Sequence, residues 1–84
     1  MIYVVGIGPG NEAHMTPAAR EAIGAAQWII GYKTYLDLIR PLIETKHVYE
    51  NGMRGEVVRI KKALELAHDG YDVAIISSGD AGVY

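Results

Sequence analysis

Short strand-like runs alternate with helix-like segments along the whole chain, and this alternation constrains the fold more than any other feature. The strand-like runs cover residues 2–7, 28–30, 46–49 and 71–77. The helix-like segments between them cover residues 18–26, 32–39 and 56–68. This order is typical of parallel strands joined by helical crossovers. The sequence therefore predicts an α/β fold, an open and mostly parallel sheet with flanking helices.

Local signals predict how the helices begin and end. Thr16 is a good N-cap, and Pro17 suits the first helical position that follows it. The helix over residues 32–39 is expected to end before Pro41, because proline interrupts a helix interior. Gly70 stands where a left-handed C-terminal cap belongs. In the first helix, spacing predicts one apolar face: Ala19, Ala22, Ile23 and Ala26.

The segment over residues 56–68 has the clearest helical pattern. Its apolar residues recur at helical spacing and predict one buried stripe. The members of that stripe are Val57, Ile60, Leu64 and Ala67. The charged residues between them are predicted to face solvent: Arg59, Lys61, Lys62 and Glu65.

Composition limits the classes of function. A chain of 84 residues has room for one domain, and its net charge of −2 is not that of a nucleic-acid-binding surface. It contains no cysteine, which favours a cytoplasmic location, and its three histidines lie too far apart in sequence to suggest a metal site. No apolar run approaches the roughly 20 residues of a membrane helix.

Two strands end in turns of small residues. Gly6, Gly8 and Gly10 follow the first strand, and a Ser-Ser-Gly-Asp turn over residues 77–80 ends the last. Ligands of open parallel sheets bind outside the carboxyl ends of the strands, so a small-molecule site built from main chain is expected there. A dinucleotide site fits poorly, because Asn11 replaces the third glycine and Pro9 removes an amide. The Walker and Gly-x-Ser-x-Gly motifs are absent.

These turns also resemble a known family. The segment Val-Gly-Ile-Gly-Pro-Gly over residues 5–10, the pair Met15-Thr16, and Ser-Gly-Asp-Ala-Gly-Val-Tyr over residues 78–84 are similar to landmarks of the tetrapyrrole (corrin/porphyrin) methyltransferases. Met15 replaces the leucine of that pattern, and Ala81 replaces a frequent proline. The resemblance covers essentially the whole chain but only the N-terminal domain of a two-domain enzyme, so residues 1–84 are expected to lack a C-terminal domain.

The resemblance implies a chemistry. Residues 31–35, 52–56 and 77–84 are most similar to the branch that methylates carbon 17 of precorrin-3B or cobalt-factor III, with ring contraction, in cobalamin biosynthesis. S-adenosylmethionine would be the methyl donor, a tetrapyrrole the acceptor, and the full-length parent a homodimer. The implied donor-binding residues are Pro9, Ser78, Gly79, Asp80 and Val83. The implied acceptor-binding residues are Gly8, Tyr32, Lys33, Tyr35 and Met53.

Several roles stay open at the level of sequence. Asp80 is the candidate for proton transfer, with Tyr32 and Tyr35 as possible helpers that could equally be packing residues. Lys33, Arg40 and Arg54 could attract acceptor carboxylates or be ordinary surface cations. Two alternatives remain: the chain could belong to another branch of the family, or it could be a noncatalytic nucleotide-binding module. Without a further helix, one face of the sheet is expected to be partly bare.

Overall fold

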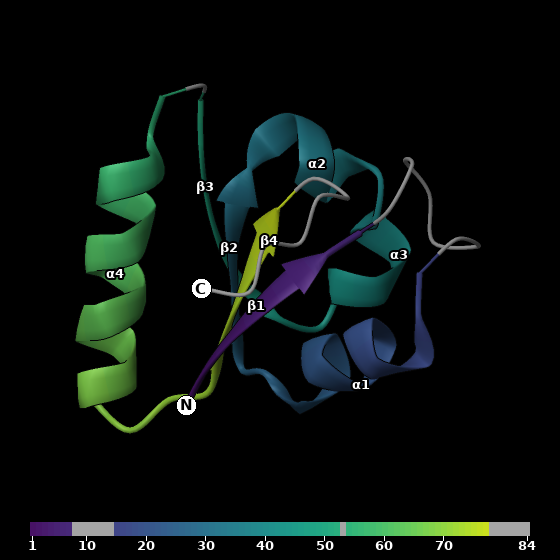
Figure 1. The fold of residues 1–84 in the computed structure, drawn as a ribbon, viewed down its shortest axis with the longest axis horizontal. Helices are drawn as coiled ribbons and strands as arrows, with labels where there is room; N and C mark the ends of the chain where they lie inside the picture. The colour runs from purple at the N-terminus through teal and green to yellow at the C-terminus, as the bar shows by residue number, and fades with distance from the viewer. Residues whose placement is uncertain (8–14, 53, 78–84) are drawn as a thin grey trace.

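Four parallel strands form the centre of the molecule. The computed structural model describes residues 1–7, 15–52 and 54–77. The strands are β1 (Ile2–Gly6), β2 (Trp28–Tyr32), β3 (His47–Asn51) and β4 (Val73–Ser77). Their order in the sheet is β1-β4-β2-β3, and every neighbouring pair is parallel. All four carboxyl ends therefore lie at one edge of the sheet, the upper edge in Figure 1.

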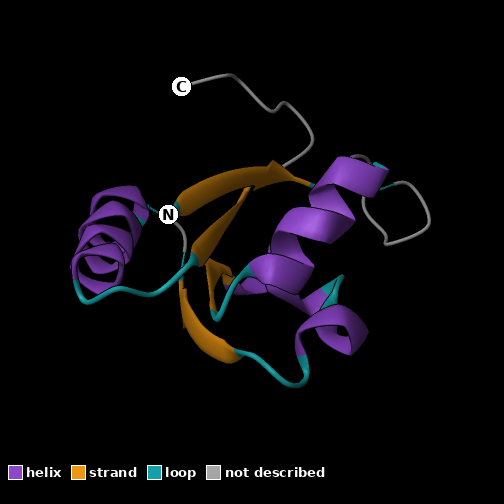
Figure 2. Ribbon diagram, turned by 90° about the horizontal axis from the view of Figure 1, so that it is seen from below, coloured by secondary structure: helices purple, strands orange, loops and turns teal. Residues whose placement is uncertain are grey.

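Helices cover both faces of this sheet. One face carries α1 (Pro17–Ala25), α2 (Lys33–Asp37) and α3 (Arg40–Ile43), and the other carries α4 (Glu56–His68). Figure 2 shows the three layers, with the sheet between α4 and the other helices. The predicted α/β class is confirmed. No helix among the described residues is both long and apolar enough to span a bilayer.

Most predicted helix ends are confirmed. The Thr16 hydroxyl oxygen accepts a hydrogen bond from the Ala19 amide at 3.1 Å, which satisfies one of the free amides of the first turn. Gly70 adopts a φ of 96°, the left-handed conformation expected after α4. Strand ends differ by one or two residues from those predicted; β2 and β3, for example, run on to Tyr32 and Asn51.

The predicted helix over residues 32–39 is wrong in its bounds, because two short helices replace it. The α2 helix ends at Asp37, and α3 starts at Arg40 with Pro41 inside its first turn. In a continuous helix the Pro41 ring would clash with the carbonyl of Asp37. Ile39, at φ −125° and ψ 20°, breaks the helix instead, and Pro41 then occupies a position that needs no amide hydrogen.

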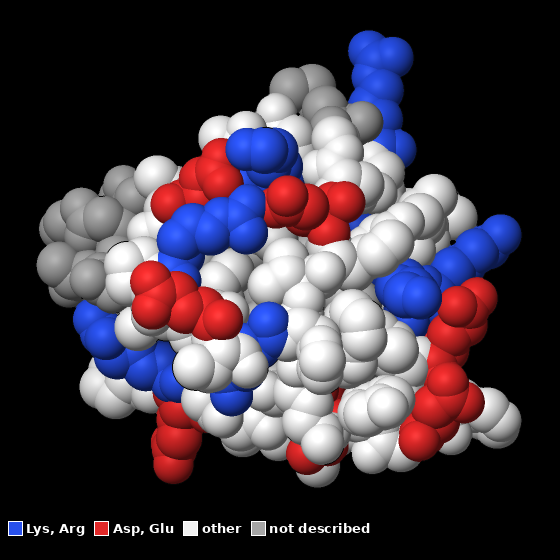
Figure 3. All heavy atoms as spheres, turned by 180° about the vertical axis from the view of Figure 1, so that it is seen from behind, with Lys and Arg blue, Asp and Glu red and all other residues white. Residues whose placement is uncertain are grey.

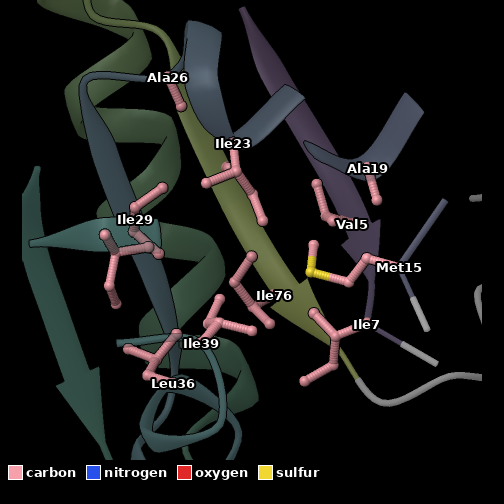
Figure 4. Close-up of a cluster of buried hydrophobic side chains, with 12 residues drawn as sticks. Val5, Ile7, Met15, Ala19, Ile23, Ala26, Ile29, Leu36, Ile39 and Ile76 are labelled. Atoms are coloured by element: carbon pink, nitrogen blue, oxygen red, sulfur yellow. The ribbon is translucent and has the colours of Figure 1, made fainter. Parts of the chain in front are cut away.

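The larger part of the core lies between the sheet and helices α1–α3 (Figure 4). Ile23 of α1 and Leu36 of α2 pack there with Ile29 and Ile76 of the central strands. The predicted face of α1 is confirmed, since Ala19, Ile23 and Ala26 are buried and Ala22 packs against the same cluster. A smaller cluster joins α4 to the other face and consists of Ile30, Ala63, Leu66 and Val73.

The predicted buried stripe of α4 is wrong for three of its four residues, and the fourth, Ala67, is half-buried. Val57, Ile60 and Leu64 are exposed, at 66%, 52% and 57%, and the buried residues are Ala63 and Leu66. Two of the cations that were expected in solvent face the sheet instead and are half-buried, Arg59 and Lys62. Their long aliphatic stems cover apolar surface while their charges find partners. The Lys62 ammonium lies 6.0 Å from the Trp28 ring centre and 5.7 Å from that of Tyr49.

The α4 face of the sheet is only partly covered. Ile2 packs at the edge of the α4 cluster, and strand alternation places Val4 on the same face. Val4 is 48% exposed. Among the described residues α4 is the single helix on this face, and the exposed part lies along β1. The bare surface was expected over the last strand, β4, but Val73, Ala74 and Ile76 of that strand are buried.

Candidate functional site

The carboxyl ends of β1 and β4 lie side by side. Gly6 is in register with Ser77, and the Ile7 amide donates a hydrogen bond to the Ser77 carbonyl at 3.3 Å. The Ser77 hydroxyl donates to the Val5 carbonyl at 3.4 Å. The chain therefore enters both small-residue turns from adjacent strand ends, although the strands themselves are about 70 residues apart in sequence.

Most of the implied site residues lie outside the described part of the chain. These are Gly8, Pro9, Met53, Ser78, Gly79, Asp80 and Val83. The described residues that precede them in sequence end β1, β3 and β4, or directly follow those ends, at the carboxyl edge of the sheet. Tyr32, Lys33 and Tyr35 are described and follow the end of β2 at that same edge.

The two tyrosines contact each other. Their ring centres are 5.2 Å apart and their planes are nearly perpendicular, at 89°, which is a favourable edge-to-face arrangement. Both side chains are half-buried. Tyr35 also packs against the main hydrophobic core, so it has a structural role whatever else it does.

Lys33 and Arg40 are held in a network of ion pairs. Asp37 accepts a hydrogen bond from Lys33 at 2.9 Å and one from the Arg40 Nη2 at 2.7 Å, and Arg40 also pairs with Glu50 of β3. Hydrogen bonds from Lys33 and then Arg40 lower the pKa of Asp37 below its ordinary 3.8. Those from Arg40 to Glu50 and Asp37 raise the pKa of the guanidinium. Figure 3, a view from behind relative to Figure 1, shows acidic and basic side chains that adjoin one another on the surface.

A second polar cluster fixes the turn between β3 and α4. The Asn51 amide nitrogen donates to the Gly55 carbonyl at 3.1 Å, and the Asn51 amide oxygen accepts from Arg59 Nη1 at 2.6 Å. Arg59 also donates to the Gly52 carbonyl at 3.3 Å. Sequence reasoning missed this cluster, because it treated Arg59 as solvent-facing. The four-residue spacing of Asn51 and Gly55 is the signal that could have found it.

One surface hollow among the described residues lies elsewhere. Its volume is about 360 Å³, and it is lined at the amino ends of β2 and β3 by residues that include Gln27, Lys46 and His47. None of the predicted site residues lines it. Within residues 1–7, 15–52 and 54–77, no three potential metal-ligating side chains come together. The carboxyl edge is therefore the site that both the turns and the fold support.

Comparison with known proteins gives a consistent result. The family model for Tetrapyrrole (Corrin/Porphyrin) Methylases matches residues 1–84. A probable cobalt-factor III C(17)-methyltransferase of Salmonella typhimurium is 50% identical over the whole chain, and a cobalt-factor III methyltransferase of Priestia megaterium is 49% identical over 99% of it. The chain spans 35% and 15% of the length of these two relatives.

A solved structure agrees with the sequences. The crystal structure of the methyltransferase CobJ superposes with a TM-score of 0.86 and 38% identity, over 99% of this chain and 34% of that one. At this identity the likeness extends beyond the fold, and it covers the same strands whose ends form the carboxyl edge. The chain belongs to the tetrapyrrole (corrin/porphyrin) methylase family.

Proposed function

We propose that this chain is the N-terminal domain of an enzyme that transfers the methyl group of S-adenosylmethionine to carbon 17 of cobalt-factor III or precorrin-3B, with ring contraction, in cobalamin biosynthesis. The observation that carries the proposal is the adjacency of Gly6 and Ser77, which starts both small-residue turns at one point of the carboxyl edge. The relatives whose names include cobalt-factor III methyltransferase support the choice of acceptor.

The donor would bind against the main chain of the two turns. Pro9, Ser78, Gly79, Asp80 and Val83 are the residues we propose for it. A glycine such as Gly79 lets a ligand approach the backbone closely, and the Asp80 carboxylate can attract a sulfonium. Methyl transfer is a displacement that needs alignment of two reactants and no covalent enzyme intermediate. A C-terminal domain would supply the other wall of the site.

The acceptor would lie along the rest of the same edge. We propose that Gly8, Tyr32, Lys33, Tyr35 and Met53 contact it, since Tyr32 and Lys33 follow β2 and Met53 follows β3. Asp80 is the proposed group for proton transfer during ring contraction. A homodimeric parent and a cytoplasmic location belong to the same proposal.

The direct test is an assay of the full-length protein with S-adenosylmethionine and cobalt-factor III. The expected product gains one methyl group by mass spectrometry, and its carbon spectrum places that group at carbon 17 of a contracted ring. Methylation of a different tetrapyrrole, with none of cobalt-factor III, would move the enzyme to another branch of the family. Calorimetry with S-adenosylhomocysteine, NAD and ATP tests the nucleotide-module alternative, which predicts no preference for the first ligand.

A substitution separates the two roles proposed for Asp80. Asp80→Asn in the full-length enzyme keeps the size of the side chain and removes its charge and its ability to take a proton. If Asp80 moves a proton, kcat is expected to fall by about 100-fold or more with the KM for S-adenosylmethionine little changed. A rise in that KM with an unchanged kcat supports donor binding alone and contradicts the catalytic role.

A further inference from the structure

We propose that Arg54 binds a carboxylate side chain of the tetrapyrrole acceptor, and that Asn51 and Arg59 are positioning residues that hold Arg54 for this contact. This inference rests on the function proposed above and extends it. Three cations lie in or beside the loops of the carboxyl edge, and the inference assigns the pairing with an acceptor carboxylate to one of them. Lys33 keeps the acceptor contact proposed above, with its charge paired to Asp37.

The charges of the other two candidates are already compensated. Lys33 pairs with Asp37, and Arg40 pairs with both Asp37 and Glu50. A carboxylate ligand would compete with these existing partners for either cation. Arg54 is exposed, and within the described residues it has no ion pair or side-chain hydrogen bond. Arginine is also the side chain best shaped for a two-point contact with a carboxylate.

The backbone of Arg54 is set in an uncommon conformation. Its φ is 69°, and it is the one residue other than glycine with a positive φ in the part of the chain that the structure describes. This conformation is unfavourable for arginine, and the surrounding contacts must enforce it. An arginine at a position that glycine would occupy more easily points to a use for its side chain.

Asn51 and Arg59 enforce this conformation from both ends of the turn. Asn51 binds the Gly55 carbonyl, and Arg59 binds both the Asn51 side chain and the Gly52 carbonyl. The fit is close, because a Cβ atom on Gly55 would lie 2.5 Å from the Asn51 Cγ. The turn is thus tied to β3 and to the first turns of α4 on either side of Arg54.

The position of the turn suits a wide ligand. Asn51 is in register with Tyr32 at the end of β2, so the turn lies at the same edge as the proposed donor site. The strand order places β3 three strand spacings from β1, which is about 14 Å. A ligand of four linked pyrrole-type rings, held by its reacting carbon near β1 and β4, can extend its peripheral carboxylates toward β3.

The test compares Arg54→Gly with Arg54→Lys in the full-length enzyme. Glycine accepts the positive φ and removes the guanidinium, so the turn is expected to keep its shape. The KM for cobalt-factor III is expected to rise about 10-fold or more in Arg54→Gly, as for loss of a hydrogen bond between charged groups, and less in Arg54→Lys. The KM for S-adenosylmethionine and kcat should stay the same. Lys61→Gln, an equal charge change at an exposed position of α4, is the matched control and should change neither constant.

A double-mutant comparison tests the positioning role. Asn51→Ala is expected to raise the acceptor KM when Arg54 is present, and to add little when Arg54 is already glycine. If Asn51 had a purely structural role, Asn51→Ala would instead raise the acceptor KM by the same factor whether or not Arg54 is present. Binding of S-adenosylhomocysteine and the circular dichroism spectrum show that each variant is folded.

Failure of this inference differs from failure of the proposed function. If the wild-type enzyme methylates cobalt-factor III and Arg54→Gly does so with an unchanged acceptor KM, the role of Arg54 is disproved while the function stands. If the wild-type enzyme methylates no tetrapyrrole, the proposed function is wrong and the inference falls with it.

Discussion

At the scale of single residues, Gly31 shows how closely α2 approaches the sheet. A Cβ atom there would lie 2.9 Å from the Leu36 Cδ2 and 3.3 Å from the Ile76 Cβ, both in the main core. Gly31 therefore admits Leu36 against the end of β2. It also sets where the following residues, Tyr32 and Lys33, leave the sheet.

Gly31→Ala is expected to lower the free energy of unfolding by roughly 1–3 kcal/mol, because the added methyl overpacks this contact. Gly24→Ala is the control: nothing lies within 4 Å of its added Cβ, and it stands in α1. There alanine should raise stability by about 0.5–1 kcal/mol. Urea denaturation measures both changes. Equal effects of the two substitutions would contradict the close packing at Gly31.

Asp37 is the residue whose ionisation should affect stability in acid. Its pKa is lowered by hydrogen bonds first from Lys33 and then from Arg40, so the folded state favours the carboxylate. A group with a lowered pKa adds stability above its unfolded value of 3.8, and that stability is lost as pH falls through the lower folded value. The carboxylate is exposed, so the effect should be small.

The corresponding variant is Asp37→Asn. Its melting temperature should lie below that of the wild type near neutral pH, and the two should converge as the pH falls below 3.8. Salt should reduce the neutral-pH difference. A difference that grew on acidification would show that the ion pairs of Lys33 and Arg40 do not stabilise the carboxylate.

At the scale of elements, α4 shows where periodicity misleads. Its apolar residues fit a helical stripe, yet the sheet receives Ala63 and Leu66 while Val57, Ile60 and Leu64 stay exposed. Spacing identifies an apolar stripe and does not say whether that stripe meets the sheet. Arg59 and Lys62 decide it, because their partners, Asn51 and the rings of Trp28 and Tyr49, lie on β2 and β3.

This orientation predicts that truncating two leucines of the 84-residue chain changes stability by very different amounts. Leu66→Ala, at 6% exposure, should cost about 2–4 kcal/mol of stability, since it leaves a cavity beside the sheet. Leu64→Ala, at 57% exposure, should change stability by about 0.5 kcal/mol or less. Thermal melts followed by circular dichroism compare them. A larger loss for Leu64→Ala would restore the stripe expected from the sequence.

The sequence predicts elements of this fold better than their arrangement. Local signals suffice for α4, for the cap at Thr16 and for the left-handed Gly70, because each depends on neighbours within a few residues. The insertion of β4 between β1 and β2 depends on distant pairings, of Val73 with both Ile2 and Trp28, which periodicity does not encode. The Asn51 and Arg59 cluster was missed because the sequence alone does not distinguish a half-buried arginine with a partner from one that faces solvent.

At the scale of the whole molecule, the insertion of β4 has the largest consequence for function. It makes Gly6 and Ser77 neighbours, so residues from the first and last strands meet at one point of the carboxyl edge. Either turn alone would offer a short stretch of main chain to a ligand. Because both turns start from these neighbouring strand ends, we propose that the methyl donor binds there, against main chain from both.

A site that contacts its ligand from one side binds that ligand more weakly than a site that encloses it from two sides. The chain covers about a third of the Salmonella relative, and we propose that a further domain closes the donor site in the full-length enzyme. In calorimetry, S-adenosylhomocysteine should therefore bind the 84-residue chain at least 100-fold more weakly than it binds the full-length enzyme, because roughly half of the contacts are lost. No methylation of cobalt-factor III is expected from the chain alone. Turnover by the isolated chain, or equal affinity in both forms, would place the whole donor site within these residues and remove the need for a second wall.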